Sequence, residues 1–235
     1  MARRGHAAGA AALGVAMLFM APGSAPAAGD CTRNAQPGVD WSECMKERRV
    51  MSQVDLTGAN LDLADLSGSD LSGSRLAGAS FERASLTRAH LRDADLTGAR
   101  LEKTEATRAS FVGANLTGAN LTKGEFLRGE FMGATLVRAN LEKAEFGRAD
   151  FRDADLTGAN LTGAYLARAD FRGARLGDAD FTEAYTLLVL FHGADLSKVV
   201  GLTQDQLDAA CGDGATVLPE GMVRPSTWVC APDED

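Results

Sequence analysis

The chain has 235 residues, a formal net charge of −8 and an aromatic content of only 6%. Alanine and glycine are abundant, and such small side chains cannot fill a wide globular core, so any enclosed interior must be narrow. The acidic balance disfavours sequence-independent binding to nucleic acid.

Residues 1–27 have the pattern of a signal peptide. Arg3 and Arg4 precede an apolar run, and the sequence Ala-Pro-Ala at 25–27 is an A-x-A cleavage signal. The apolar run of about 12 residues is shorter than the ~20 that span a bilayer, which argues against a transmembrane anchor. We therefore expect export to the periplasm or the cell exterior, cleavage after Ala27 and no membrane span in the mature chain.

A five-residue period fills residues 54–200. From Leu56 to Phe181 every fifth residue is Leu or Phe, except Ala106, and a small residue lies two positions earlier in nearly every unit. Neither 3.6 nor 2 divides this period, which excludes an amphipathic helix and an ordinary strand array. Such a unit buries one large and one small side chain, which favours a coil that turns every five residues and stacks on itself.

The phenylalanines indicate how many units form one coil, because large side chains stack best on like side chains. They recur at a spacing of twenty residues, as Phe111, Phe131, Phe151, Phe171 and Phe191, whereas a spacing of fifteen gives only two pairs. The series predicts four units per coil. About seven coils at the ~4.8 Å separation of neighbouring strands would form a rod roughly 34 Å long.

The unit A-(D/N)-L-x-x, as in Ala94-Asp95-Leu96-Thr97-Gly98, resembles the repeat of the pentapeptide-repeat family. The resemblance covers residues 54–198 and implies an all-β fold, a right-handed quadrilateral β-helix. Some members of that family resemble duplex DNA and modulate DNA gyrase, so the resemblance also implies a DNA mimic as one function to consider.

Both ends of such a coil need covers, since an open end exposes backbone groups and apolar side chains. We expect residues 28–53 to form an N-terminal cap and residues 201–235 to form a C-terminal cap. In the C-terminal segment, Thr203 and Gln206 have the spacing of a capping box. The pattern predicts a short helix from about 204 to 211.

The four cysteines lie outside the repeats, two at each end, and an even number in an exported protein indicates disulfides. The rod separates the two ends by tens of Å, whereas a disulfide needs Cα atoms within about 7 Å of each other. Only the pairs Cys31–Cys44 and Cys211–Cys230 are compatible with that separation. A zinc site is the alternative, but no histidine lies near either pair.

Outward positions twenty residues apart should form columns along the rod, and one column is cationic: Arg88, Arg108, Arg128, Arg148 and Arg168. Stacked cations about 5 Å apart repel each other unless they are balanced. Acidic columns flank them, with Glu105, Glu125 and Glu145 on one side and Glu130, Asp150 and Asp170 on the other. We expect a self-neutralised lattice of ion pairs. Binding of a polyanion, such as a glycan or a lipid head group, is the functional alternative.

The repeat falters near residue 187. Leu187, Leu188 and Leu190 are apolar where neighbouring coils have polar residues, and Tyr165 lies one coil below Tyr185. Such a patch is either covered by the chain's own tail, which we expect, or forms a homodimer contact through the end of the solenoid.

No residue pattern typical of catalysis is found. His90 and His192 lie about five coils apart, and the carboxylates lie on a convex wall without an evident pocket. Residues 54–198 carry 21 acidic and 17 basic residues, a net charge of −4, which together with the arginine column argues against DNA mimicry. We expect an exported, non-enzymatic structural or protein-interaction scaffold with no cofactor or metal, an unidentified protein partner and no nucleic acid. A DNA-mimicking modulator of gyrase is the alternative.

Overall fold

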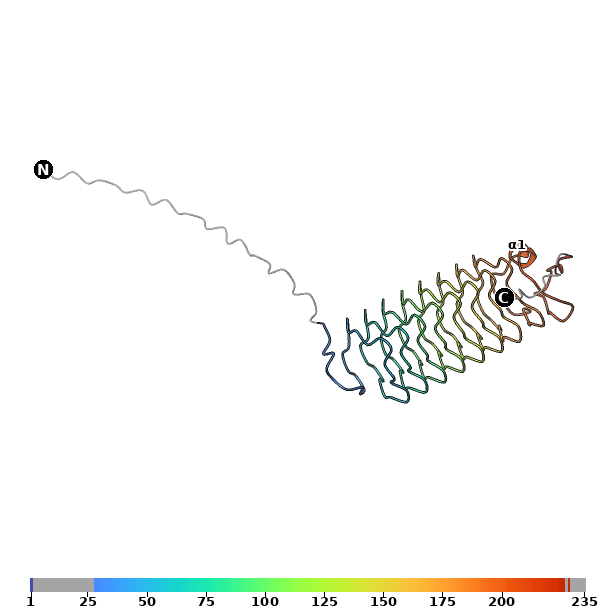
Figure 1. Ribbon diagram of the computed structural model, residues 1–235. Helices are drawn as coiled ribbons and strands as arrows, with labels where there is room; N and C mark the ends of the chain where they lie inside the picture. Colours follow the sequence, from blue (N-terminus) through green and yellow to red (C-terminus); the bar gives the residue numbers. More distant parts are fainter. Residues whose placement is uncertain (2–27, 227, 229–235) are drawn as a thin grey trace.

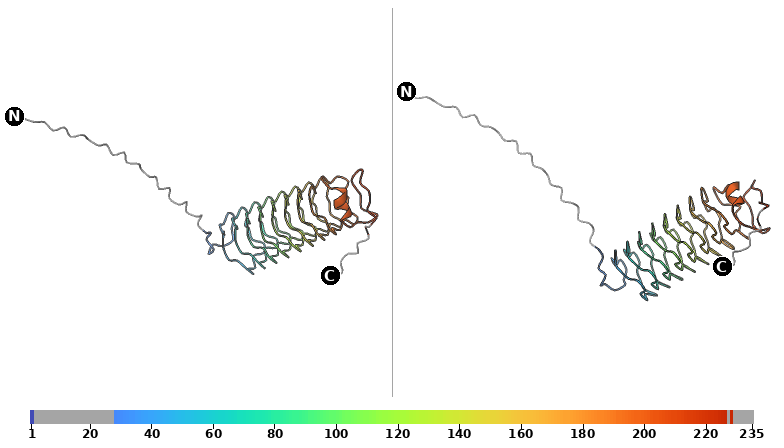
Figure 2. Two further views of the ribbon diagram at one scale, coloured as in Figure 1. Left: turned by 90° about the horizontal axis from the view of Figure 1, so that it is seen from above. Right: turned by 45° about the horizontal axis from the view of Figure 1, so that its top comes forward.

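The computed structural model describes Met1, residues 28–226 and Trp228. The chain winds into a straight rod of stacked coils with helix α1 at one end (Figures 1 and 2). Parallel β-bridges join residues twenty positions apart, from Asp40–Asn60 to Asp180–Val200, so the predicted coil length is confirmed. Among the described residues, α1 (Gln204–Asp208) is the only helix, and each strand is no more than a single bridge.

Each five-residue unit forms one side and one corner of a square coil. At the side, the Leu96 N–H donates to the Asn115 carbonyl at 2.7 Å, and the Asn115 N–H donates to the Ala94 carbonyl at 2.9 Å. At the corner, the Ala99 N–H donates to the Leu96 carbonyl at 2.9 Å and closes a β-turn. The third residue of that turn, Gly98, has a φ of +63°. Four such corners return the chain to its starting position one coil higher, and a coil therefore contains twenty residues.

The Asp or Asn at the second position of the unit ties the side to the corner. The Asp95 Oδ1 accepts hydrogen bonds from the N–H and the hydroxyl of Thr97 at 3.1 and 2.6 Å. Asp155 accepts the same two bonds from Thr157 at 3.0 and 2.6 Å. Hydrogen bonds of this kind stabilise turns, which explains why Ser or Thr so often follows the acid by two positions.

The interior consists of columns of Leu, Phe and Ala that are almost completely buried. The phenylalanines stack as their spacing indicated: the ring centroids of Phe111–Phe131, Phe131–Phe151 and Phe151–Phe171 are 4.8, 4.9 and 4.8 Å apart. Offset or stacked rings at this separation attract each other beyond the effect of burial. The narrow core therefore holds a continuous aromatic stack in the middle of the rod.

The coils begin earlier than expected. The first bridge is at Asp40, not near residue 54, so the expected N-terminal cap over 28–53 is too long and the rod has about eight coils rather than seven. In this first coil Lys46 and Arg49 occupy register positions that later coils bury, and their side chains are half-buried and exposed, respectively, which hides the repeat in the sequence. The coil forms nevertheless, because its bridges use backbone groups that every residue carries.

The first coil is covered by the segment that precedes it. Trp41, only 2% exposed, closes the end of one core column, and the Lys46 Nζ lies 4.0 Å from the centre of its ring. Cys31 and Cys44 form a disulfide with a Cα–Cα distance of 5.5 Å. The disulfide ties the N-terminal segment to the first coil.

Helix α1 covers the other end through the predicted capping box. The Thr203 hydroxyl accepts a hydrogen bond from the Gln206 N–H, and the Gln206 Oε1 accepts one from the Thr203 N–H at 2.8 Å. The Gln206 Nε2 also donates to the carbonyls of Phe181 and Ala184 at 2.9 and 2.7 Å. One side chain thus begins the helix and satisfies two carbonyls at the end of the rod.

The helix is shorter than expected because the chain rejoins the rod directly after it. Cys211, the expected last residue of the helix, forms a parallel bridge with Leu190, and α1 therefore ends at Asp208. No described cysteine is a free thiol. Cys230, the expected partner of Cys211, lies outside the described residues, as do residues 2–27 of the expected signal peptide.

Candidate interaction surface

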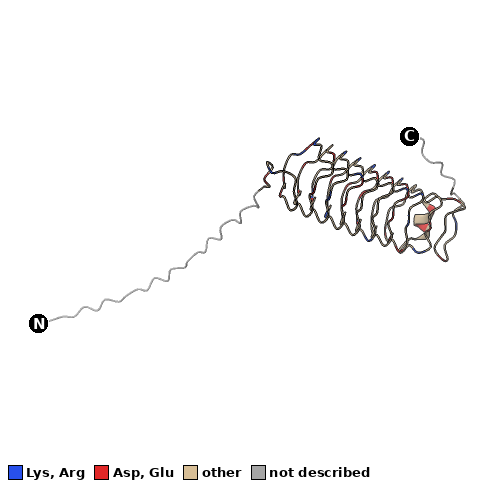
Figure 3. Ribbon diagram, turned by 90° about the horizontal axis from the view of Figure 1, so that it is seen from below, with Lys and Arg blue, Asp and Glu red and all other residues tan. Residues whose placement is uncertain are grey.

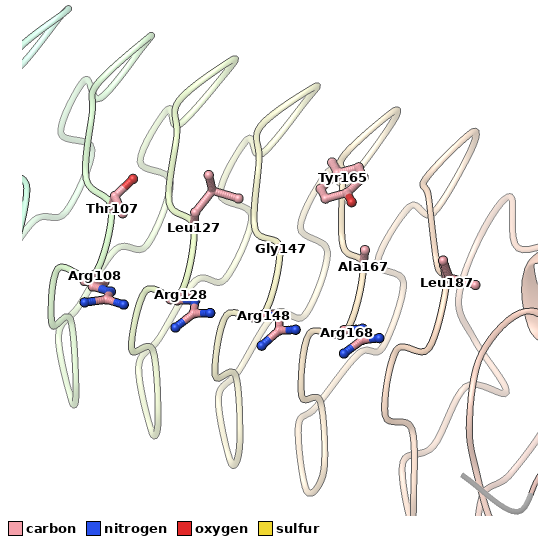
Figure 4. A pocket seen from close by; sticks show the side chains of 10 residues that line it. All are labelled: Thr107, Arg108, Leu127, Arg128, Gly147, Arg148, Tyr165, Ala167, Arg168 and Leu187. Atoms are coloured by element: carbon pink, nitrogen blue, oxygen red, sulfur yellow. The ribbon is translucent and has the colours of Figure 1, made fainter. Parts of the chain in front are cut away.

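One corner of the rod carries an arginine in five successive coils: Arg88, Arg108, Arg128, Arg148 and Arg168, with φ values between +55° and +60°. Figure 4 shows four of these side chains in a row, one from each coil. Other corners have glycine in the same left-handed position, as at Gly98 and Gly118, or a further charged residue, as at Lys103. The left-handed conformation costs an L-residue about 1–2 kcal/mol, so each arginine of this column makes its corner less stable than a glycine would.

Four of the arginines line a shallow groove of about 550 Å³ (Figure 4). We call this surface the arginine groove; it is lined by Thr107, Arg108, Leu127, Arg128, Gly147, Arg148, Tyr165, Ala167, Arg168 and Leu187. Gly147 and Ala167 are its smallest residues and form its floor. A Cβ atom on Gly147 would lie 3.1 Å from both Leu127 Cδ2 and Tyr165 Cε1, so these two side chains close over the glycine.

Aromatic and apolar side chains border the groove at its C-terminal end. Tyr165 and Tyr185 are 44% and 47% exposed, and their rings stack with centroids 5.1 Å apart. Leu187, in the same coil as Tyr185, is 41% exposed. Large apolar side chains are therefore accessible beside a row of cations.

The tail covers the rest of the apolar patch. The Leu188 N–H donates to the Ala209 carbonyl at 2.7 Å, and Leu190 forms the bridge with Cys211. Both leucines are half-buried as a result. The apolar patch expected from the sequence is thus divided, and of its three leucines only Leu187 lines the groove, together with Tyr165.

The carboxylates on one side of the arginine column are bonded to other arginines. Arg152 donates two hydrogen bonds to Asp150 at 2.9 and 2.6 Å, and Arg172 binds Asp170 in the same bidentate way. Burial raises the pKa of Asp150, but the hydrogen bonds and the charge of Arg152 outweigh it and the pKa is lowered. The hydrogen bond to Asp170 raises the pKa of Arg172. These two acids are therefore paired with arginines at the next corner of the rod.

The carboxylates on the other side form a column of their own, in which Glu105, Glu125 and Glu145 are exposed and joined by bridges. Among the described residues, neither Arg108 nor Arg128 forms an ion pair. Figure 3 shows basic and acidic positions interspersed along the rod. Within the described part of the chain, the ion pairs of Asp150 and Asp170 are therefore formed with Arg152 and Arg172 and not, as expected, with the arginine column.

The groove is chemically suited to recognition. Guanidinium groups form paired hydrogen bonds with carboxylates and stack on aromatic rings, and tyrosine offers both a ring and a hydroxyl. Among the described residues, no group of His, Cys, Asp and Glu is arranged to hold a metal ion. Within the same part of the chain, no helix has the length and the apolar composition to cross a membrane.

Sequence reasoning identified the arginines and Tyr165 but did not identify the floor. The residue before each arginine is Thr107, Leu127, Gly147 and Ala167 in successive coils, so side-chain size falls after Leu127 and the surface dips at Gly147 and Ala167. Reading that column at the twenty-residue spacing could have indicated the depression. Its depth depends on the neighbouring rings and is a property of the folded rod.

A family model described as pentapeptide repeats matches residues 50–88, 84–123, 130–166 and 149–185. Similar solved structures include HetL from Nostoc sp. strain PCC 7120, a pentapeptide repeat protein involved in heterocyst differentiation regulation. It is 27% identical, over 81% of this chain and 91% of that chain, with a TM-score of 0.39. No curated protein sequence matches.

Another similar structure is QnrB1, a plasmid-mediated fluoroquinolone resistance protein, with 19% identity over 72% of this chain and 88% of that chain and a TM-score of 0.49. A pentapeptide repeat protein from the Arabidopsis thaliana thylakoid lumen is 29% identical over 52% and 76%, with a TM-score of 0.38. Since the family model covers more than half of the residues, the chain belongs to the pentapeptide-repeat family, and its fold is the right-handed quadrilateral β-helix.

Proposed function

We propose that this chain is an exported, non-enzymatic scaffold that binds a protein partner through the arginine groove, in the periplasm or outside the cell. The observation that carries the proposal is the groove itself, where arginine, tyrosine and leucine side chains meet at one corner of the rod. Arginine and tyrosine are enriched at the centres of protein interfaces, where they contribute most of the binding energy.

The construction of the rod supports this role. Each coil pairs its backbone with the next, so the positions that line the groove are held on a rigid wall. Binding sites on regular elements keep their geometry better than sites on loops. The lining side chains recognise and pack, and none of them is a carboxylate, histidine or thiol that could act as a general base or nucleophile.

Two features support export. The first is the signal-peptide pattern over residues 1–27, with its Ala-Pro-Ala cleavage signal. The second is the Cys31–Cys44 disulfide, because stable disulfides are typical of oxidising compartments such as the periplasm.

The alternatives have less support. A DNA mimic needs a continuous negative surface, which the arginine column interrupts. A polyanion in the groove would lie beside Glu105, Glu125 and Glu145, which repel it. A homodimer through Leu188 and Leu190 at the end of the rod would have to displace the segment after α1, which lies against both leucines.

Mass spectrometry tests the export half of the proposal. The protein isolated from its native host should begin at or near Ala28, the residue after the cleavage signal. An intact chain that begins at Met1 in the cytoplasm would contradict export and would favour a cytoplasmic role, such as the alternative of a gyrase modulator.

Site-specific photo-crosslinking in living cells tests the interaction half. A photoreactive residue at Thr107, within the groove, should give protein crosslinks. The matched control is Thr117, a half-buried threonine at the diagonally opposite corner of the coils. Equal crosslinking at the two positions, or none at Thr107, would refute the groove as the interaction surface.

A further inference from the structure

We propose that the partner in the arginine groove is a second copy of this chain, and that the two rods lie side by side and parallel, related by a two-fold axis along their length. The inference rests on the proposed function, because it names the partner of the same groove. It concerns the long side of the rod and not its ends.

Three neighbouring columns carry the inference. The first is acidic and then aromatic, the second is the floor of the groove, and the third is basic. Each column adds one residue per coil, so a single coil presents one member of each side by side, for example Glu125, Leu127 and Arg128. The columns consist of Glu105, Glu125, Glu145, Tyr165 and Tyr185; of Thr107, Leu127, Gly147, Ala167 and Leu187; and of Arg108, Arg128, Arg148, Arg168 and Leu188.

A two-fold axis parallel to the rod and above the floor column exchanges the outer columns and keeps every coil at its own level. Arg128 of one copy then faces Glu125 of the other, and the reverse pair forms at the same time. An axis across the rod, which would make the copies antiparallel, places arginine opposite arginine. Since like charges in contact are unfavourable and a two-fold interface must be self-complementary, only the parallel arrangement fits.

The match continues along the rod as the side chains change. Where the acidic column changes to Tyr165, the residue across the axis is Arg168, which can lie over the tyrosine ring as a cation–π pair. One coil further the match ends, because Leu188 replaces the arginine there and is half-buried beside the Ala209 segment.

The residues of the floor column and the ion pairing of the arginines agree with this arrangement. Residues on a two-fold axis meet their own copies, and the middle of the floor column offers apolar side chains there, with Leu127 lying over the buried Gly147 and then Ala167 and Leu187. Arg108 and Arg128 form no ion pair within the described part of their own chain, so pairing across the axis breaks none. A purely acidic segment would meet the glutamate column, whereas a second copy presents both charges in the matching order.

Sedimentation velocity and native mass spectrometry of the full exported chain test the inference. The wild type should be a dimer. Arg128→Glu should weaken it at least about 100-fold, because two like-charge contacts replace two ion pairs. Glu125→Arg should weaken it similarly. An equimolar mixture of these two variants should form a heterodimer, since one chain then presents two acids and the other two bases at that level.

The mixture separates an interface from a loss of stability, because damage within each single chain would not be repaired by mixing. Arg138→Glu is the matched control: Arg138 has the same φ of +55° as Arg128 but lies at the diagonally opposite corner. It should leave the dimer unchanged. Circular dichroism should show the folded rod for every variant.

A monomeric wild type at about 100 μM, well above the typical dissociation constants of specific interfaces, would overturn the inference. Failure of the mixed variants to associate would overturn the parallel arrangement. If the wild type is monomeric and Thr107 still crosslinks to a different protein, the dimer is wrong and the proposed function stands. If it is monomeric and Thr107 gives no crosslinks, both are wrong.

Discussion

The stacked phenylalanines should contribute measurably more to stability than phenylalanines without ring neighbours. Phe151 is fully buried and its ring contacts those of Phe131, Phe146 and Phe171, with centroids 4.9, 5.2 and 4.8 Å away. Phe81 is equally buried, but within the described part of the chain no aromatic ring contacts it. The two sites therefore form a matched pair for the change Phe→Leu.

The difference between the two variants isolates the ring contacts, because Phe→Leu removes a similar volume at both sites. An aromatic pair contributes about 0.5–1.5 kcal/mol beyond burial. Phe151 loses three pairs and Phe81 loses none. Since neighbouring contacts are not fully additive, we expect Phe151→Leu to be more destabilising than Phe81→Leu by at least about 1.5 kcal/mol.

Guanidinium denaturation followed by circular dichroism measures the free energy of unfolding of each variant. Because a solenoid can unfold in parts, hydrogen exchange of the amides in the adjacent coils should show the same order of stability locally. Destabilisation of the two variants that agrees within about 0.5 kcal/mol would refute the reasoning, since that is the scatter of ordinary substitutions.

Three further predictions concern a cap, a corner and a carboxylate. Gln206→Ala should lower the free energy of unfolding by about 1–3 kcal/mol in denaturation, because it leaves the Ala184 carbonyl without its donor and removes one of the two donors of the Phe181 carbonyl. Leu63→Gly should stabilise the rod by about 1 kcal/mol in the same assay, because Leu63 is 52% exposed at a φ of +58°. Burial raises the pKa of Asp155, but hydrogen bonds from Thr157 and Arg175 outweigh it and the pKa is lowered. Its ionised form therefore stabilises the fold above the unfolded pKa of about 3.9 and this contribution is lost as pH falls through the lower folded pKa. Thermal melts should show Asp155→Asn less stable than wild type at pH 7, with the gap closing in acid.

Each of the three has an outcome that contradicts it. An effect of Gln206→Ala smaller than about 0.5 kcal/mol would mean that water replaces the donor at the end of the rod. A destabilising Leu63→Gly would mean that the leucine packs against the wall. A constant gap between wild type and Asp155→Asn from pH 7 to pH 2 would mean that the charge of Asp155 contributes nothing.

The repeat and the coil length could be predicted because both follow from burial. Every inward position must hold a side chain of suitable size, so the Leu and Phe period appears in the sequence, and the Phe series at twenty residues shows the stacking directly. The capping box of Thr203 and Gln206 could be predicted for a similar reason, since its hydrogen bonds join residues three positions apart.

The limits of the rod could not be predicted, because they depend on backbone pairing and not on side-chain pattern. The coil that begins at Asp40 has Lys46 and Arg49 at register positions that later coils bury, and it still pairs its backbone with the next coil. At the other end the helix pattern continues toward Cys211, but a bridge to Leu190 competes with it and ends α1 at Asp208. Long-range backbone hydrogen bonds leave no local signal.

The sequence alone determined which residues point inward and which columns run along the outside of the rod, since these follow from a period of five and a coil of twenty. Only the tertiary structure decided how the outward side chains combine. Asp150 pairs with Arg152, two positions along the same coil, and not with the arginine column, because the direction of the corner brings that guanidinium onto both carboxylate oxygens. The groove likewise exists because the Tyr165 ring and Leu127 close over Gly147. Inward residues share one buried environment, which shows in their composition. For an outward residue, the geometry of the folded rod decides which of several neighbours it contacts.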